Sequence, residues 1–344
     1  MKWRTFLQKS SPFLVWTAAL LLLAAALRSV PVPKITAVLR GLSPWEVAGL
    51  AAVNLLVLML LNGRWWLLLH AQGATVPFFV LTAHRLAAFA VSYFTPGPHF
   101  GGEPVQVALV VRRHGVGRAE AVAAVSLDKA LELLVNFGFL AVGLGVVAQV
   151  GIWRGQVGWL SLALAAVLLA LPVGVLTLWL AGKRPFTTLS YCFRPLIHKF
   201  PRLYRGYQQL IHNVQAAEVQ VTAVCQRRPS ALWGALVVSV LGWLAMIAEF
   251  WLMLSFLGLP LSPAAIMIAM TAARVAFLLP LPGGLGTLEA SQVLVFAALG
   301  LDTAVAVSAV LLIRARDVGL GVLGVLWGLR WLERKPRYVT ESGD

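Results

Sequence analysis

Residues 96–103 of the chain read PGPHFGGE, and residues 282–289 read PGGLGTLE. Both stretches consist of Pro-Gly, five further residues and Glu, and they lie 186 positions apart. Each runs into an apolar segment too short to cross a bilayer, Pro104–Val111 in the first case and Leu288–Leu299 in the second. At about 1.5 Å per residue these segments cover roughly half of a ~30 Å hydrocarbon core. We therefore predict that both are re-entrant half-helices.

The match between the two stretches extends in both directions. Upstream, Arg85 and Arg274 each lie within an apolar segment. Downstream, residues 129–132 read KALE and residues 314–317 read RARD, at an offset of 185. The repeated unit is therefore a helix with an arginine, a Pro-Gly loop ending in Glu, a half-length helix, and a long helix with a basic-x-x-acidic pair.

The composition excludes a water-soluble globule. Of the 344 residues, 60% are hydrophobic and 12% are charged, about half of the roughly 25% charged residues that soluble domains carry. This composition also excludes disorder. The 28 basic and 13 acidic residues give a net charge of +15, which on this apolar background favours anionic lipid over nucleic acid as a partner. Cys192 and Cys225 lack CxxC spacing, so we expect neither a disulfide framework nor a zinc site.

Long apolar segments indicate a polytopic membrane protein. The first candidate, Pro12–Leu27, resembles a signal peptide, but we expect an uncleaved span because many spans follow it. The other long candidates are Trp45–Leu69, Pro77–Phe94, Ala119–Val150, Val157–Leu180, Ala231–Leu257, Pro263–Leu279 and Thr303–Leu329. We predict an all-α fold with about eight full spans and two short segments, arranged as two inverted repeats.

The distribution of Lys and Arg predicts the topology. Lys183–Ser230 contains eight basic residues against the single acid Glu218, so we place it in the cytoplasm together with residues 112–118 and both termini. The turns near Leu259 and Leu301 lack Lys and Arg and are placed outside, which gives the two units opposite orientations. The predicted external loop Arg28–Pro44 departs from this rule because it carries three basic residues. Inverted repeats with Gly/Pro-broken short segments are typical of transporters, which bind their substrate near the midplane. We expect location in a bacterial-type inner (plasma) membrane.

Seven regions follow from this topology. They are N-terminal membrane spans (1–76), repeat unit 1 (77–150), a connecting span (151–182), a basic cytoplasmic amphipathic linker (183–230), a second connecting span (231–262), repeat unit 2 (263–332) and a cytoplasmic tail (333–344). Within the linker, apolar residues recur at near-helical spacing from Tyr207 to Val224, with Glu218 interrupting the stripe. The linker is either an amphipathic helix on the inner leaflet or a solvated connector.

Ionisable residues inside apolar segments are functional candidates, because each costs several kcal/mol unless it is paired or hydrated. Glu249 also lies in the middle of a span. A structural interpretation makes the basic-x-x-acidic motifs neutral i,i+3 pairs. It also gives Glu103 and Glu289 a helix-capping role: Glu103 would cap the first half-helix, with Pro104 at its first helical position, and Thr287 could cap the second.

A functional interpretation assigns the same residues to a lipid headgroup. Arg85 and Arg274 would bind a phosphate, and Glu103 and Glu289 would accept a proton or a lipid ammonium. Half-helix N-termini would add a positive field. His99 would either join a proton path or serve as an ordinary interfacial residue.

Residues 92–134 and 279–323 resemble the two signature regions of the flippase-like transmembrane domain. This domain forms the membrane half of bacterial lysyl-phosphatidylglycerol synthases and also occurs as stand-alone membrane proteins. The resemblance covers nearly the whole chain and implies a lipid flippase fold with central re-entrant helices. The site residues that it implies are Arg85, Pro96, Gly97, Gly102, Glu103, Lys129, Glu132, Arg274, Pro282, Gly283, Gly284, Gly286, Glu289, Arg314 and Asp317. The first unit departs from the family pattern at Asp128-Lys129, where Glu-Arg is more usual.

The sequence therefore predicts a lipid translocator that moves a phospholipid or related amphiphile, either zwitterionic or aminoacylated, between leaflets without nucleotide hydrolysis. The alternative is an accessory membrane subunit that presents lipid to a separate synthase or glycosyltransferase. GxSxG, HExxH and Walker motifs are missing, so we expect neither an enzyme nor a cofactor. No aminoacyl-transferase domain follows the membrane region, so we expect a stand-alone member. The expected partners are membrane lipids, with a homo-oligomer and a lipid-modifying enzyme as further candidates.

Overall fold

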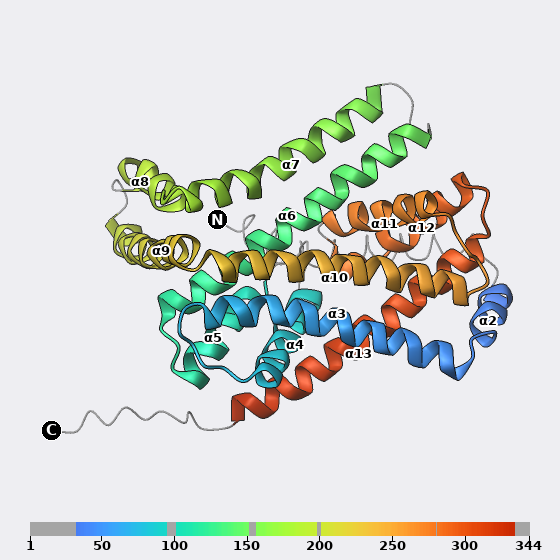
Figure 1. Ribbon diagram of the computed structural model, residues 1–344, viewed down its shortest axis with the longest axis horizontal. Helices are drawn as coiled ribbons and strands as arrows, with labels where there is room; N and C mark the ends of the chain where they lie inside the picture. The colour runs from blue at the N-terminus through green and yellow to red at the C-terminus, as the bar shows by residue number, and fades with distance from the viewer. Residues whose placement is uncertain (1–31, 95–100, 151–155, 198–200, 280, 334–344) are drawn as a thin grey trace, which may run out of the picture.

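The computed structural model describes residues 32–94, 101–150, 156–197, 201–279 and 281–333. Within these ranges every regular element is helical (Figure 1). The elements are α2 (Val32–Arg40), α3 (Pro44–His70), α4 (Phe78–Phe94), α5 (Glu103–His114), α6 (Arg118–Val150), α7 (Gln156–Leu180), α8 (Pro185–Ile197), α9 (Pro201–Arg227), α10 (Pro229–Phe256), α11 (Pro263–Leu278), η1 (Pro282–Gly284), α12 (Thr287–Ala298) and α13 (Thr303–Glu333). The predicted all-α class is confirmed for the described part of the chain.

The predicted apolar segments coincide with these helices to within a few residues. Among the described residues, four helices are long and apolar enough to cross a membrane: α3, α6, α7 and α10. α4 and α11 have 17 and 16 residues, slightly fewer than the ~20 of an upright span. The first predicted span, Pro12–Leu27, and the tail from residue 334 lie outside the described residues, so the total of eight spans stays a prediction.

The two short apolar segments form helices α5 and α12, of 12 residues each. At 1.5 Å per residue each is about 18 Å long, a little more than half of the hydrocarbon core. Both begin directly after a glycine, Gly102 for α5 and Gly286 for α12. Their length and their starting points agree with the prediction of half-helices, whereas their depth in the membrane stays a prediction.

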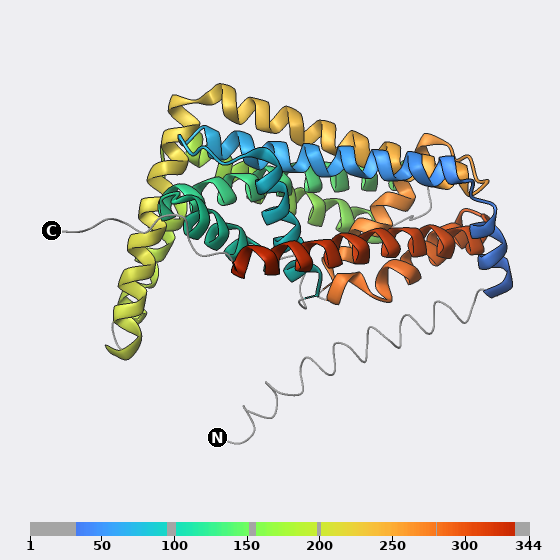
Figure 2. The same cartoon turned by 90° about the horizontal axis from the view of Figure 1, so that it is seen from below.

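Two successions of helices have matching lengths. α3 to α6 have 27, 17, 12 and 33 residues, and α10 to α13 have 28, 16, 12 and 31. α3 packs along α10, and Figures 1 and 2 show that the two run in opposite directions. α6 and α13 also run in opposite directions in Figure 1. An inverted repeat requires these directions, and it stays a prediction.

α13 also packs closely along α4. A Cβ atom on Gly324 of α13 would overlap the carbonyl oxygen of Leu86, and one on Gly328 would lie 3.2 Å from the Cβ of Ala87. Gly324 and Gly328 form a Gly-x-x-x-Gly motif, the spacing that lets membrane helices approach backbone to backbone. The glycines therefore fix the distance between α4, which carries Arg85, and α13, which carries Arg314.

Most of the described basic segments gather at one end of the molecule. The end of α5 with Arg112 and Arg113, the helices α8 and α9, and the end of α13 lie together, and the turns after α10 and α12 lie at the opposite end (Figure 1). The predicted loop Arg28–Pro44 is not a plain loop, because residues 32–40 of it form helix α2. α2, which ends at Arg40, is the basic exception at this opposite end, and its Ile35 packs against Ala304 and Val307 of α13. The arrangement agrees with the predicted topology, although the side that faces the cytoplasm stays a prediction.

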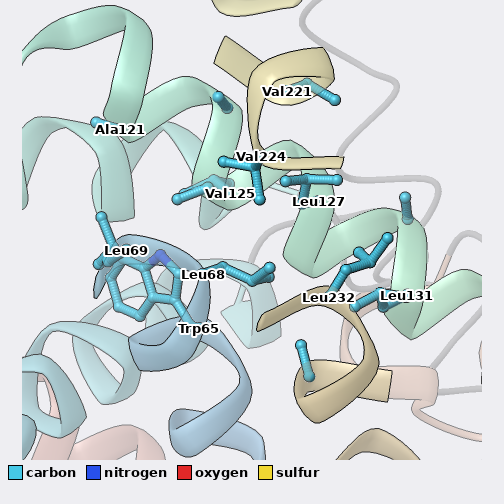
Figure 3. Packing of buried hydrophobic residues seen from close by; sticks show 14 of the residues in the cluster. Trp65, Leu68, Leu69, Ala121, Val125, Leu127, Leu131, Val221, Val224 and Leu232 are labelled. Atoms are coloured by element: carbon cyan, nitrogen blue, oxygen red, sulfur yellow. The ribbon is translucent and has the colours of Figure 1, made fainter. Parts of the chain in front are cut away.

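The apolar stripe of α9 packs against the protein. Val221 and Val224 lie in one cluster with Val125 and Leu127 of α6 and Trp65 of α3 (Figure 3). A solvated connector does not fit this part of the linker, because these side chains are buried. A position of α9 on the inner leaflet stays a prediction.

Glu218, which interrupts the stripe in the sequence, is itself buried. Its carboxylate accepts hydrogen bonds from Trp179 Nε1 at 3.0 Å, Phe186 N at 3.0 Å and Thr187 N at 2.7 Å. Two of these donors are backbone N–H groups in the first turn of α8, where intrahelical acceptors are missing. The glutamate thus joins the end of α7, the start of α8 and the middle of α9.

We predict that Gly324→Ala lowers the thermal unfolding midpoint and that Gly319→Ala on the same helix does not. The added methyl group at position 324 forces α4 and α13 apart, whereas a Cβ at position 319 meets no atom within 4 Å. Alanine otherwise favours a helix over glycine by about 1 kcal/mol. The midpoints are compared for the two purified variants in one detergent. Equal midpoints would show that the two helices adjust without cost.

Candidate functional site

The predicted residues of the first unit form an ion-pair network between α5 and α6. Lys129 Nζ lies 3.1 Å from Glu103 Oε1 and 2.9 Å from Glu132 Oε1. Glu103 Oε2 also accepts a hydrogen bond from Gly101 N at 2.8 Å. The predicted i,i+3 pair of Lys129 and Glu132 is therefore present, and Glu103 adds a second carboxylate to the same ammonium group.

Arg64 of α3, which the sequence analysis missed, lies at the centre of this network. Its side chain is 1% exposed, and its Nε donates to Asp128 Oδ1 at 2.6 Å. Arg64 Nη2 lies 3.3 Å from Glu132 Oε2, and Arg85 Nη2 lies 3.2 Å from Asp128 Oδ2. Arg64 thus contacts Asp128 and Glu132 directly and is joined to Arg85 through Asp128. One buried guanidinium therefore connects α3 with α4 and α6.

The second unit surrounds Arg314 of α13 with acceptors. The guanidinium binds Glu289 with two contacts, Nε to Oε1 at 3.0 Å and Nη2 to Oε2 at 3.2 Å. It also donates to the carbonyl oxygens of Gly283 and of Gly284, the latter at 2.8 Å, and to Tyr93 Oη at 3.3 Å. Gly283 and Gly284 have φ angles of +52° and +64°, a region that glycine enters without strain. The glycines of the Pro-Gly loop therefore direct their carbonyl groups at the arginine.

The predicted neutral pair of Arg314 and Asp317 is wrong. Asp317 instead binds Arg316 Nε at 2.9 Å. Arg316 also pairs with Glu249 of α10 and donates to Asn54 Oδ1 of α3 at 3.2 Å. Arg314 does not pair with Asp317 because its five N–H groups are already used by Glu289, the carbonyl groups of Gly283 and Gly284, and Tyr93.

Glu289 combines the capping and the electrostatic interpretation, whereas the predicted cap at Glu103 is wrong, because α5 begins after Gly102 and has no side-chain cap. Glu289 Oε2 accepts from Gly286 N at 2.9 Å and so caps α12, while both of its oxygens bind Arg314. Thr287 does not cap this helix as expected: its hydroxyl donates to the carbonyl groups of Gly284 and Ala276. Gly102 N likewise donates to Ser92 Oγ at 2.8 Å, which ties the start of α5 to α4.

The matched residues of the two units thus make matched contacts. Glu103 binds Lys129 in the first unit, and Glu289 binds Arg314 in the second. The two groups differ in exposure, because the side chains of Glu132 and Glu103 are 38% and 27% exposed while that of Glu289 is 4% exposed. The Glu289–Arg314 pair is therefore more enclosed than the first group, whereas Arg316 of the second unit is itself 30% exposed.

Arg274 is placed differently from the other core arginines. Its guanidinium lies 4.5 Å from the centre of the Trp243 ring, and Nη2 lies 3.4 Å from Met246 Sδ. No carboxylate within the described ranges forms an ion pair with it. Arg85 Nη1 is also buried, and it has no hydrogen-bond partner among the described residues. Glu132 interacts electrostatically with both Arg85 and Arg274.

The structure describes only some of the remaining predicted positions. Pro96, Gly97 and His99 lie outside the described residues. Pro282 begins the short helix η1. No group of three or more His, Cys, Asp or Glu side chains within the described ranges could hold a metal ion.

The fold and the charge network define the chain as a polytopic helical membrane protein with paired ionisable residues in its interior. The family model for the lysylphosphatidylglycerol synthase TM region matches residues 12–324, so the chain belongs to this family. It is 23% identical over 286 residues to a UPF0104 membrane protein of Pyrococcus horikoshii, with 81% of this chain and 84% of the relative covered. It is 25% identical over 299 residues to a UPF0104 membrane protein of Methanothermobacter thermautotrophicus, with 83% and 85% covered. No solved structure matches the chain.

We predict that Glu289→Gln destabilises the protein far more than Glu103→Gln. Removing one partner of a buried pair leaves an uncompensated charge and costs about 3–5 kcal/mol, whereas pairs near solvent contribute about 0–1 kcal/mol. Glu289 and Arg314 are 4% and 11% exposed, and Glu103 and Lys129 are 27% and 20% exposed. The measurement is the unfolding midpoint of each purified variant.

The double variant Glu289→Gln/Arg314→Gln completes the cycle, because it removes both charges. It should be more stable than the sum of the two single losses implies. Two results would contradict a stabilising role of the buried pair. The first is a loss of stability in the double variant equal to the sum of the two single losses, and the second is an equal loss for Glu103→Gln and Glu289→Gln.

Proposed function

We propose that the protein translocates a phospholipid or related amphiphile between the two leaflets, without nucleotide hydrolysis. A charged headgroup cannot enter hydrocarbon without losing several kcal/mol of hydration free energy. A protein lowers this barrier when its own side chains replace the lost water. Membership of a family defined by the membrane region of a lipid-modifying enzyme supports a lipid as the cargo.

The observation that carries the proposal is the unused donor capacity of Arg85 and Arg274. Every described core cation except Arg274 has a carboxylate partner, Arg85 included through Asp128, and Arg314 also binds two carbonyl groups. Arg85 keeps one nitrogen without a partner, and Arg274 has an aromatic ring and a thioether instead of a carboxylate. Guanidinium groups match phosphate geometry with two parallel hydrogen bonds. We assign the headgroup phosphate to these two arginines.

The glutamates contribute differently from one another. Glu289 is occupied by Arg314 and by the helix cap, so it serves to hold the Pro-Gly loop. Glu132 and Glu103 are the more exposed carboxylates. They are the better acceptors for an ammonium group, which suits a zwitterionic or aminoacylated phospholipid. We therefore assign a structural role to Glu289 and the ammonium contact to Glu103 and Glu132.

Alternating access follows if the two groups open in turn. Glu103 and Glu132 of the first group are more exposed than Glu289 of the second, and α3 and α6 run opposite to α10 and α13. Rocking of one unit against the other would close the first group and open the second toward the opposite leaflet, as inverted-repeat transporters do. Acyl chains would stay in the bilayer throughout.

We predict that Arg274→Gln and Arg85→Gln each slow translocation about tenfold or more. Loss of one charge-assisted phosphate contact costs about 1.5–3 kcal/mol, and 1.4 kcal/mol corresponds to a factor of ten. The assay uses proteoliposomes with the purified protein, a headgroup-labelled lipid and a membrane-impermeant quencher. Arg228→Gln is the matched control, because this arginine is exposed and makes no side-chain cap.

Protein-dependent loss of inner-leaflet protection supports translocation. Equal quenching with and without protein, for anionic, zwitterionic and aminoacylated lipids alike, would contradict it. That result would favour an accessory subunit that presents lipid to a separate synthase or glycosyltransferase.

A further inference from the structure

A groove of about 580 Å³ lies between α5, α6 and α9, away from Arg85 and Arg274. α5 and α6 form a helical hairpin, closed by the turn Gly115-Val116-Gly117. Gly115 has a φ angle of +65°, which terminates α5 and reverses the chain. The groove follows this hairpin from its turn to the start of α5, at the end of the molecule where the basic segments gather (Figure 1).

The groove is apolar along its length and charged at its ends. Its apolar lining comes from one face of each helix, with i, i+3, i+4 and i+7 spacing on α5 (Pro104, Val107, Ala108, Val111) and i, i+3 spacing on α6 (Val122, Val125). Arg112 and Arg118 lie at the hairpin turn, and Glu103 lies at the other end. The eight residues from Pro104 to Val111 correspond to about 12 Å of helix.

A second cavity of about 390 Å³ adjoins the basic end of the groove. The two share Arg118, Val122 and Asn213, and the second adds His212 of α9. This cavity provides donors and space beside the two arginines. A ligand with a polar head and an apolar chain would find room for the head here and for the chain along the hairpin.

Arg112 and Arg118 are exposed, and neither forms an ion pair with a carboxylate in the described part of the chain. Exposed guanidinium groups at a membrane surface attract anionic lipid, by about 1 kcal/mol each. They also bind phosphate with two hydrogen bonds. The charge of the groove mouth therefore complements an anionic headgroup.

The geometry points to a binding site for one anionic phospholipid, with its phosphate on Arg112 and Arg118 and one acyl chain along the α5–α6 hairpin. A lipid in the inner leaflet has this orientation when the basic end faces the cytoplasm. The inner end of the groove reaches Glu103, which binds Lys129 of the first charge group. The inference deepens the proposed function, because the groove then delivers lipid to that group. Binding itself can be measured without transport.

The test uses phosphatidylglycerol with a diazirine at the end of one acyl chain, and the purified protein in mixed micelles. After irradiation the labelled peptides are identified by mass spectrometry. We expect labelling of residues 104–125 in the unaltered protein. Arg112→Gln/Arg118→Gln should lower it at least fivefold. Arg184→Gln/Arg228→Gln removes the same charge from exposed positions outside the groove and should leave it unchanged.

A third variant separates a lipid from a soluble phosphate. Ala108→Trp fills the apolar groove and leaves both arginines in place, so it should also lower labelling fivefold. Excess glycerol phosphate should not compete. Labelling that is equal in all variants, or spread evenly over the exposed face of α7, would show surrounding bilayer lipid only and overturn the inference. Failure of translocation with intact labelling would contradict the proposed function and leave the groove assignment standing.

Discussion

Neutralisation of buried charge is the constraint on which the rest of this structure depends. Twelve ionisable side chains lie in two groups inside an apolar helical framework: Arg64, Arg85, Glu103, Asp128, Lys129 and Glu132 in one, and Glu249, Arg274, Glu289, Arg314, Arg316 and Asp317 in the other. Each group holds three cations and three carboxylates, so each is neutral overall. A single unpaired charge at this depth would cost several kcal/mol. Helices that carry opposite charges therefore have to pack against each other, as α3 does on α6 and α10 does on α13.

The Pro-Gly loops serve the same purpose through the backbone. A loop inside hydrocarbon would leave carbonyl groups unsatisfied. In the second unit the carbonyl groups of Gly283 and Gly284 are instead turned toward Arg314, whose charge they help to solvate. Glu289 completes the arrangement by binding the arginine and the first turn of α12 together. The broken helix and the buried cation thus stabilise each other, which explains why one motif contains both the glycines and the glutamate.

Apolar length in the sequence was sufficient to predict the long and the half-length membrane helices to within a few residues. It did not predict α2, which lies in the expected loop Arg28–Pro44, or α8. The sequence repeat identified Glu103 and Lys129 as candidates, and the structure pairs them. The partner choice within each cluster was not predictable. Arg64 appears in the sequence as one arginine in an apolar run, and only the packing of α3 on α6 brings it to Asp128. Glu218 appeared as an interruption of a stripe because its three donors lie on other segments.

The difference between the two groups is more informative than their likeness. Equal sequence motifs would give equal exposure if the two units had the same environment. Instead, Glu289 and Arg314 are enclosed by the loop carbonyls and Tyr93, whereas Glu132 remains 38% exposed. α9 packs on α6 beside the first group, whereas α13 packs against α2, α4, α10 and α12. Under the proposed translocation, such a difference between two similar groups is what a two-state carrier requires, because the opposite state is reached by exchanging the conformations of the two units. The neutral charge groups permit this exchange, since neither unit has to move a net charge across the hydrocarbon core.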